Sequence, residues 1–140
     1  MADELDIFAN KIKGLINELP YLVAQAGSKV EAEMADLNVE QMNEGILSTG
    51  KKITPKYSDN YAKMKGFKTP NLKLEGDFQS GVFVETKQDY FKFDSIDGKT
   101  SDLEWEYSNE IFGIAPKNEQ KQADFIDPYL LELIDKKLST

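Results

Sequence analysis

The chain has 140 residues, a length that fits one domain with a real hydrophobic core. Hydrophobic residues make up 40% of it and charged residues 30%, which is typical of a globular chain and too apolar for a disordered one. All 17 basic residues are lysine, and the sequence contains no histidine, cysteine or arginine. These absences exclude histidine proton shuttles, thiolate nucleophiles, disulfides and the usual structural zinc site.

The formal net charge of −8 at pH 7 would repel a phosphate backbone. Without arginine the chain also lacks the side chain best suited to bidentate recognition of phosphate or guanine. We therefore expect no sequence-specific binding of nucleic acid. The opening stretch, MADELDIFANKIKG, holds no uninterrupted apolar run, so we expect neither a signal peptide nor a membrane partner, and synthesis in the cytoplasm.

Residues 1–44 are expected to be helical. Asp3 is a candidate helix cap, with Asp6 three residues further on, and an apolar stripe follows at helical spacing. The members of this stripe are Leu5, Phe8, Ile12, Leu15, Ile16 and Leu19. Pro20 interrupts the stripe, so either a new helix starts near it or one long helix kinks there.

The apolar stripe restarts after the proline. Its second set of members is Leu22, Val23, Ala26, Val30, Met34 and Leu37. Asn38 with Gln41 is then expected to cap one further turn that ends at Gly45. Gly14 and Gly27 lie within the helical stretches, where each costs about 1 kcal/mol relative to alanine, so packing must compensate.

Residues 45–70 are expected to form an extended loop with a short helix over 59–65, capped by Ser58. The segment holds two prolines, three glycines and six lysines, which makes it the basic part of an acidic protein. A loop of this length inside a compact domain is usually functional or disordered. We therefore treat it as a candidate assembly loop. Its candidate contact residues are Lys51, Lys52, Tyr57, Tyr61, Lys63 and Lys65.

Residues 71–108 are expected to form a small antiparallel sheet of three to four strands. β-Branched and aromatic residues alternate there with polar ones from 82 to 107. At the second turn, a three-residue loop over 96–98 gathers the aromatic residues on one face, whereas a two-residue turn sets them against acidic residues, so we prefer the longer loop. The gathered residues are Phe93, Trp105 and Tyr107.

Residues 120–138 are expected to form the C-terminal helix, because apolar residues recur at helical spacing from Phe125 to Leu138. Within this stretch Asp127 and Pro128 form a candidate cap and first helical position. The order of helices, loop, antiparallel sheet and helix predicts a single α+β domain over 1–140. The apolar faces of the helices exceed what one small sheet can cover, so we expect neighbouring subunits to cover part of them.

Two stretches have the outline of a ligand site and each fails at one position. Aligned on Gly98, the acidic stretch 93–104 would be an EF-hand loop with Phe93 as its first ligand, which disqualifies it. The stretch GILSTGKK at 45–52 has the glycine spacing of a phosphate loop, but Lys52 stands where serine or threonine is required. We therefore expect no metal, no cofactor, no catalytic residue and no small-molecule substrate.

Four short elements occur in order along the second half of the chain. They are the loop GILSTGKKI at 45–53 leading to a Tyr-Ser pair, a Tyr/Lys helix at 61–66, the turn LKLEGDF at 72–78, and YSNEIFGI at 107–114 before the last helix. The motif residues in the last two elements are Leu72, Leu74, Gly76, Phe78, Phe112 and Gly113. In this order the elements resemble phage virion morphogenesis and tail completion proteins.

The resemblance implies a structural, non-enzymatic phage or prophage protein involved in tail completion or head-tail joining. It implies a homo-oligomer, with a ring as one form, and contacts with tail-tube or connector proteins. The implied location is the bacterial cytoplasm during assembly and the neck or tail of the mature virion. The residues themselves leave two alternatives: an adaptor that holds an acidic partner with its lysine-rich loop, and a carboxylate-dependent hydrolase.

Overall fold

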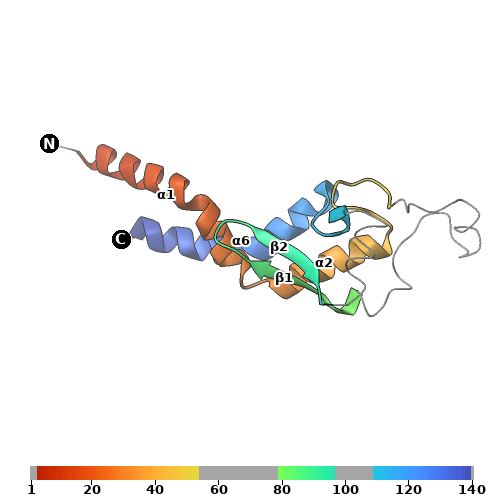
Figure 1. Ribbon diagram of the computed structural model, residues 1–140. Coiled ribbons are helices and arrows are strands. Elements are labelled where there is room, and N and C mark those ends of the chain that lie inside the picture. The colour runs from red at the N-terminus through yellow and green to blue at the C-terminus, as the bar shows by residue number, and fades with distance from the viewer. Residues whose placement is uncertain (1–2, 54–78, 97–108, 140) are drawn as a thin grey trace, which may run out of the picture.

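A computed structural model describes residues 3–53, 79–96 and 109–139, and these residues form an α+β arrangement (Figure 1). The helices in this part of the chain are α1 (Glu4–Gly27), α2 (Glu31–Asn43) and α6 (Glu119–Ser139). The strands are β1 (Val82–Thr86) and β2 (Phe91–Ser95), and the 3-10 turns are Asn109–Ile111 and Pro116–Asn118. The predicted α+β class is confirmed at this level.

α1 is a single helix that continues through Pro20, so a new helix at that residue is the wrong alternative. Asp3 caps it as predicted, because its Oδ1 accepts a hydrogen bond from the backbone N–H of Asp6 at 2.9 Å. The proline removes one backbone donor, and the packing of α1 along α6 compensates for that loss. The chain turns later, at residues 28–30, and this turn divides the second apolar stripe between α1 and α2.

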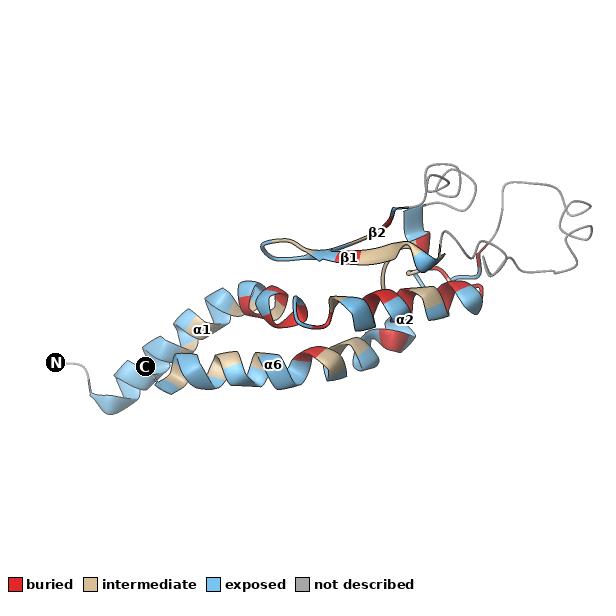
Figure 2. Ribbon diagram, turned by 90° about the horizontal axis from the view of Figure 1, so that it is seen from below, coloured by how far each residue is buried: buried red, intermediate tan, exposed pale blue. Residues whose placement is uncertain are grey.

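The elements stack so that α2 lies between the β-hairpin and the first half of α6 (Figure 2). α1 and α6 run side by side and antiparallel, with both chain ends at the same end of the molecule (Figure 1). We call residues 3–21 of α1 and 129–139 of α6 the helical arm. It projects away from the layered part that holds the core.

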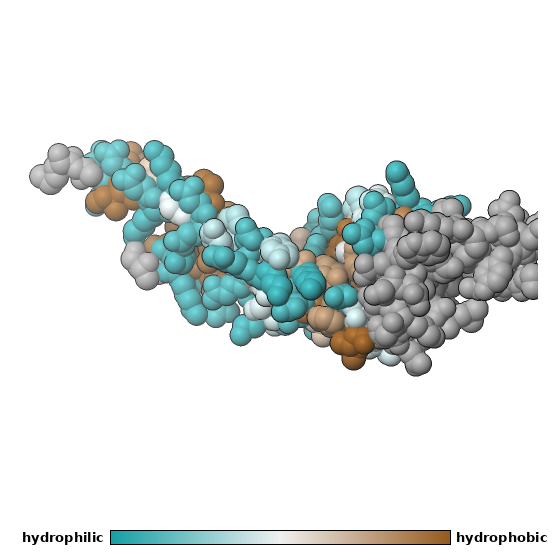
Figure 3. Space-filling model, viewed as in Figure 1, coloured by the Kyte–Doolittle hydropathy of each residue, from teal (hydrophilic) through white to brown (hydrophobic). Residues whose placement is uncertain are grey.

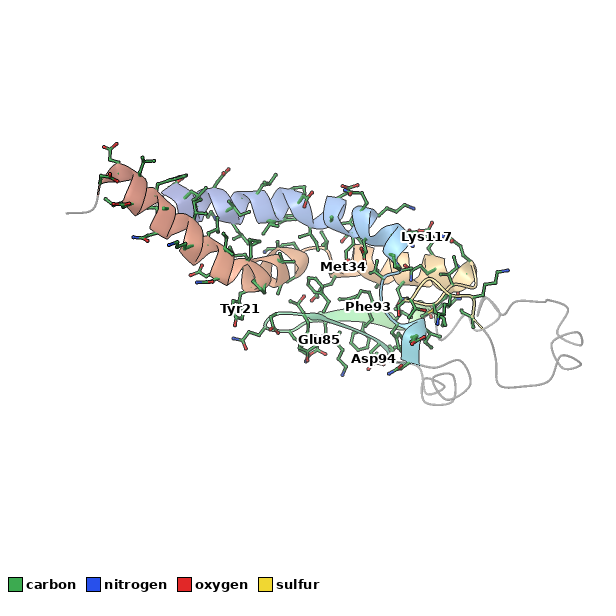
Figure 4. All side chains as sticks on the ribbon, turned by 90° about the horizontal axis from the view of Figure 1, so that it is seen from above. Tyr21, Met34, Glu85, Phe93, Asp94 and Lys117 are labelled. Atoms are coloured by element: carbon green, nitrogen blue, oxygen red, sulfur yellow. The ribbon has the colours of Figure 1, made fainter. Side chains whose placement is uncertain are left out.

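The main core fills the space between α2, the hairpin and α6. Met34 is fully buried there, and Phe93 enters the same layer from β2 (Figure 4). Glu85 and Asp94 lie on the other side of the hairpin, since successive strand residues point to opposite faces. The buried members of this core are Ala26, Val30, Met34, Ala35, Val84 and Ile126.

β1 and β2 pair antiparallel, with Val84 opposite Phe93 and Glu85 opposite Lys92. They correspond to two of the predicted strands. At the end of β1, Glu31 at the start of α2 accepts a hydrogen bond from the backbone N–H of Thr86 at 2.8 Å, which fixes the hairpin to the helix. The further strand expected to carry Trp105 and Tyr107 lies outside the described residues.

α6 begins at Glu119, well before the predicted cap at Asp127, so that cap assignment is wrong. Pro128 lies inside the helix, and the proline that starts a helical turn here is Pro116. The predicted range of 120–138 agrees with the observed helix to one residue at each end. Apolar packing on both sides of Pro128, such as that of Ile126, supports the helix across the missing hydrogen bond.

Gly27 and Gly14 provide a matched test of the contact between α1 and the hairpin. A Cβ at Gly27 would collide with the ring of Phe91, whereas a Cβ at Gly14 would meet nothing within 4 Å. We expect Gly27→Ala to lower the free energy of unfolding by about 1–3 kcal/mol, because the half-buried ring must move. Gly14→Ala should raise it by about 1 kcal/mol through helix propensity. Urea unfolding measures both, and a gain in both variants would contradict the packing of Phe91 on α1.

Candidate assembly surfaces

The start of the predicted lysine-rich loop is an ordered turn that folds back on the end of α2. Ile46 pairs with Lys52 in an isolated antiparallel bridge, and the N–H of Ile53 donates to the carbonyl of Gly45 at 2.8 Å. Gly45 and Gly50 have φ of 75° and 88°, a region that residues with a Cβ rarely adopt. Residues 45–53 are therefore not the extended chain that the sequence predicted, and 54–70 lie outside the described residues.

This turn packs against the 3-10 turn Asn109–Ile111, and the two enclose a second, smaller core. The N–H of Ser48 donates to the carbonyl of Glu110 at 2.7 Å. Gly113 has φ of 120° and lies so close to Ser48 that a Cβ on it would be 3.0 Å from the serine Cβ. Phe112 packs, half-buried, against the small core. The buried members of that core are Met42, Leu47, Ile53 and Ile111.

Gln41 holds residues 113–118 on α2. Its side chain is 0% exposed, and its Oε1 accepts hydrogen bonds from the N–H of Ala115 at 2.7 Å and from the side-chain amide of Asn118 at 2.9 Å. Its Nε2 donates to the carbonyl of Gly113 at 2.9 Å. Each polar atom of this buried amide therefore has a partner, which is the condition for burying it without a large cost.

Asn38, one turn earlier on α2, also holds this part of the chain on the helix. It is also 0% exposed, and its Nδ2 donates to the carbonyl of Ile111 at 2.9 Å. The prediction that Asn38 and Gln41 cap a helical turn is wrong, because both lie inside α2 and bond residues more than seventy positions away. We call Asn38 and Gln41, with the residues they bond, the amide clamp.

Ion pairs surround the amide clamp at the surface. Lys117 contacts Glu44 beside the end of α2 (Figure 4), and the Nζ of Lys121 lies 4.0 Å from Oε1 of Glu40. All four side chains are largely exposed, and exposed pairs contribute about 0–1 kcal/mol each. The buried amides, rather than these pairs, fix the segment to the helix.

The hairpin carries an exposed ion pair on its outer face. The Nζ of Lys87 donates to Oε1 of Glu85 at 2.7 Å, and this hydrogen bond, with the lysine charge, lowers the pKa of Glu85. The same bond raises the pKa of Lys87. A lowered carboxyl pKa adds stability above its unfolded-state value that is lost as the pH falls through the folded-state value. Because both side chains are partly exposed, 36% for Lys87 and 50% for Glu85, and salt screens such a pair, the hairpin does not depend on it.

The helical arm exposes large apolar side chains. Leu5 is 77% exposed, Phe8 54% and Ile16 58%, and Leu131 on α6 is 61% exposed. Figure 3 shows hydrophobic side chains gathered at the N-terminal end of α1. Single exposed apolar residues are normal, but several on one element are a sign of an interaction surface.

The N-terminal end of α1 lies beyond the last described turn of α6 (Figure 1). The Nζ of Lys137 lies 3.0 Å from Oε2 of Glu18, so the last described turn of α6 lies beside residue 18 of α1. The N-terminal turns of α1 project past the last described turn of α6 (Figures 1 and 2). We call residues 4–13 the α1 tip. Its apolar stripe continues the one that α6 covers further along.

Two shallow grooves flank α6 and neither gathers a set of reactive groups. One lies between α1 and α6 and has a volume of about 270 Å³. The other, of about 300 Å³, is lined by acidic residues of α2 that share one helix rather than facing each other. Those residues are Glu33, Asp36 and Glu40. Within 3–53, 79–96 and 109–139 there is no group of three acidic, histidine or cysteine side chains that could hold a metal ion.

Among the helices of these same ranges, none combines the length and the hydropathy needed to cross a membrane. No protein-family model, curated protein or solved structure matches the chain.

The structure brings some of the predicted site residues together. Lys51 and Lys52 are exposed on the turn at 45–53, and the motif residues Phe112 and Gly113 lie against that turn. The other predicted site residues lie outside the described part of the chain. They are Tyr57, Tyr61, Lys63, Lys65, Leu72, Leu74, Gly76 and Phe78.

Proposed function

We propose that the chain is a structural protein of a phage or prophage particle, a tail completion or head-tail joining protein that acts through protein contacts rather than catalysis. The observation that carries this proposal is the helical arm, on which Leu5, Phe8 and Ile16 stay exposed in the described structure. Apolar side chains of this size reduce the free energy of a complex when a partner covers them. In an assembly, the neighbouring subunit is the partner that covers these side chains.

The family resemblance supplies the partners and the location in this proposal. The protein forms a homo-oligomer, with a ring as one form, and contacts tail-tube or connector proteins. It assembles in the bacterial cytoplasm and ends in the neck or tail of the virion. The finer architecture belongs to the same proposal: a sheet of three to four strands, and a lysine-rich loop over 45–70 that meets a partner.

The amide clamp supports this role because it gives the loop a fixed base. Asn38 and Gln41 hold 111–118, and that segment in turn bonds the turn at 45–53 through Ser48. A contact loop on a rigid base loses less conformational entropy when it binds than one on a mobile base.

An adaptor that holds an acidic partner is the second candidate, and the exposure of Lys51 and Lys52 on the turn favours it. The two candidates differ in their response to salt. Charge attraction between exposed groups is screened at high ionic strength, whereas burial of apolar surface is not.

The test is native mass spectrometry and light scattering of the purified chain, alone and with tail-tube and connector proteins of the same phage or prophage, at low and high salt. We expect defined oligomers or complexes that persist at high salt. Complexes with acidic partners that disappear at high salt would favour the adaptor. A monomer that binds none of these proteins would contradict the assembly role.

A further inference from the structure

We propose that the α1 tip of one molecule packs antiparallel against the α1 tip of a second copy, about a two-fold axis that passes between Phe8 and Ala9. The occupant of the exposed stripe is thus the same segment of an identical chain. The pairing rests on the homo-oligomer of the proposed function, and it adds the surface, the register and the orientation of the contact.

The apolar part of this contact is the stripe along one face of the tip. Leu5, Phe8 and Ile12 recur at spacings of three and four, so they lie on one face of α1. Leu5 and Phe8 are exposed, and Ile12 is half-buried. In an antiparallel pair centred between residues 8 and 9, Leu5 of one copy lies at the level of Ile12 of the other, so the two stripes cover each other.

The charges of the tip are self-complementary in this orientation. Glu4 and Lys11 are seven residues apart, about two helical turns, and therefore share one flank of the stripe. Asp6 and Lys13 share the other flank in the same way. Antiparallel pairing about the proposed axis brings Glu4 of one copy to within about 3 Å, along the axis, of the level of Lys11 of the second copy.

The same offset holds between Asp6 and Lys13, so every charge on the tip meets its opposite. A parallel pair would instead bring opposite flanks together. Glu4 would then lie near Asp6 of the second copy and Lys11 near Lys13, and like charges side by side are unfavourable. In the described structure none of Glu4, Asp6, Lys11 and Lys13 has an ion-pair partner within its own chain, so these charges are available to a second copy. The charge pattern thus selects both the occupant and its direction.

The tip is short, which sets the strength of the contact. A standard specific interface buries about 800 Å² on each partner, more than a ten-residue helix face offers alone. We therefore expect the pair to be in concentration-dependent equilibrium with single chains.

The experiment uses introduced cysteines, because the natural chain has none. Ala9→Cys places a thiol beside the stripe and next to the proposed axis, and Asn10→Cys places one on the opposite face of the same helix. Both positions are exposed. Under mild oxidation at equal concentration, we expect Ala9→Cys to form a disulfide dimer at least ten times faster than Asn10→Cys. Equal rates would overturn the pairing.

Charge reversal tests the direction. Adding Glu4→Lys and Asp6→Lys to the Ala9→Cys chain makes the tip wholly basic, and we expect the cross-linking rate to fall at least fivefold. Lys11→Glu with Lys13→Glu makes a wholly acidic tip with the same loss, and mixing the two should restore cross-linking. Loss without restoration, or no loss, would overturn the antiparallel register. Circular dichroism of each variant checks that α1 is retained.

The result also separates this inference from the assembly role. If the charge-reversed chains remain oligomeric by light scattering while Ala9→Cys fails to cross-link, the assembly role stands and the tip pairing is wrong. If the natural chain is a monomer at every concentration, the tip pairing is wrong, and if it also binds no tail-tube or connector protein, the assembly role is wrong too.

Discussion

Gln41→Leu is expected to lower the free energy of unfolding by about 3–5 kcal/mol, the largest stability loss that we predict for a single substitution. Leucine has a similar volume but leaves the N–H of Ala115, the amide of Asn118 and the carbonyl of Gly113 without their partner. Each buried polar group left unpaired costs about 1–3 kcal/mol. Urea unfolding followed by circular dichroism measures the loss.

The control is Gln25→Leu, the same change at an exposed position of α1. It should alter the free energy of unfolding by less than about 0.5 kcal/mol. Hydrogen exchange adds a local readout, because the N–H of Ala115 should exchange faster in the Gln41 variant than in the control. Equal stabilities in the two variants would contradict the amide clamp.

Phe8→Ser is expected to weaken self-association at least tenfold, measured by sedimentation equilibrium. Phe8 is 54% exposed on the α1 tip, and truncation of an aromatic residue at the centre of an interface typically costs more than about 1.4 kcal/mol, which is a factor of ten. The stability of the single chain should change little, because the ring makes few contacts within its own molecule. The weaker self-association would therefore come from lost contacts at the interface rather than from unfolding.

Tyr90→Ser is the matched control for that substitution. Tyr90 is an aromatic residue of nearly equal exposure, 57%, but it lies in the hairpin turn, away from the helical arm. We expect its replacement to leave self-association unchanged. If both variants weaken association to the same degree, the contact is general hydrophobic adhesion rather than a surface on the arm.

The helices could be predicted from the sequence because periodic apolar residues report a buried face. The stripe from Leu5 to Leu19 and the capping by Asp3 are local signals, and both are found in α1. The two prolines are local signals too, but here tertiary packing overrides them. Pro20 and Pro128 break helices on local grounds, but packing of α1 and α6 against each other supports both helices across them.

The partners of the amide clamp could not be predicted from local sequence. Asn38 and Gln41 have the composition of a helix cap, and only the tertiary fold brings residues 111–118 to them. Their occurrence three residues apart inside an apolar stripe is the one signal that points to a buried polar face. The uncovered surface of the arm was expected in general terms from the excess of apolar helix. Its position was not, because it depends on how α6 lies along α1, with Lys137 beside Glu18.

The central claim is that other copies of the chain cover the exposed apolar face of the helical arm. Sedimentation velocity of the unmodified full chain over a wide range of concentration tests it most directly. The account predicts a mass that rises above the 15.8 kDa of one chain to defined multiples as the concentration increases. A mass that stays at 15.8 kDa up to the highest concentration that remains clear would contradict it.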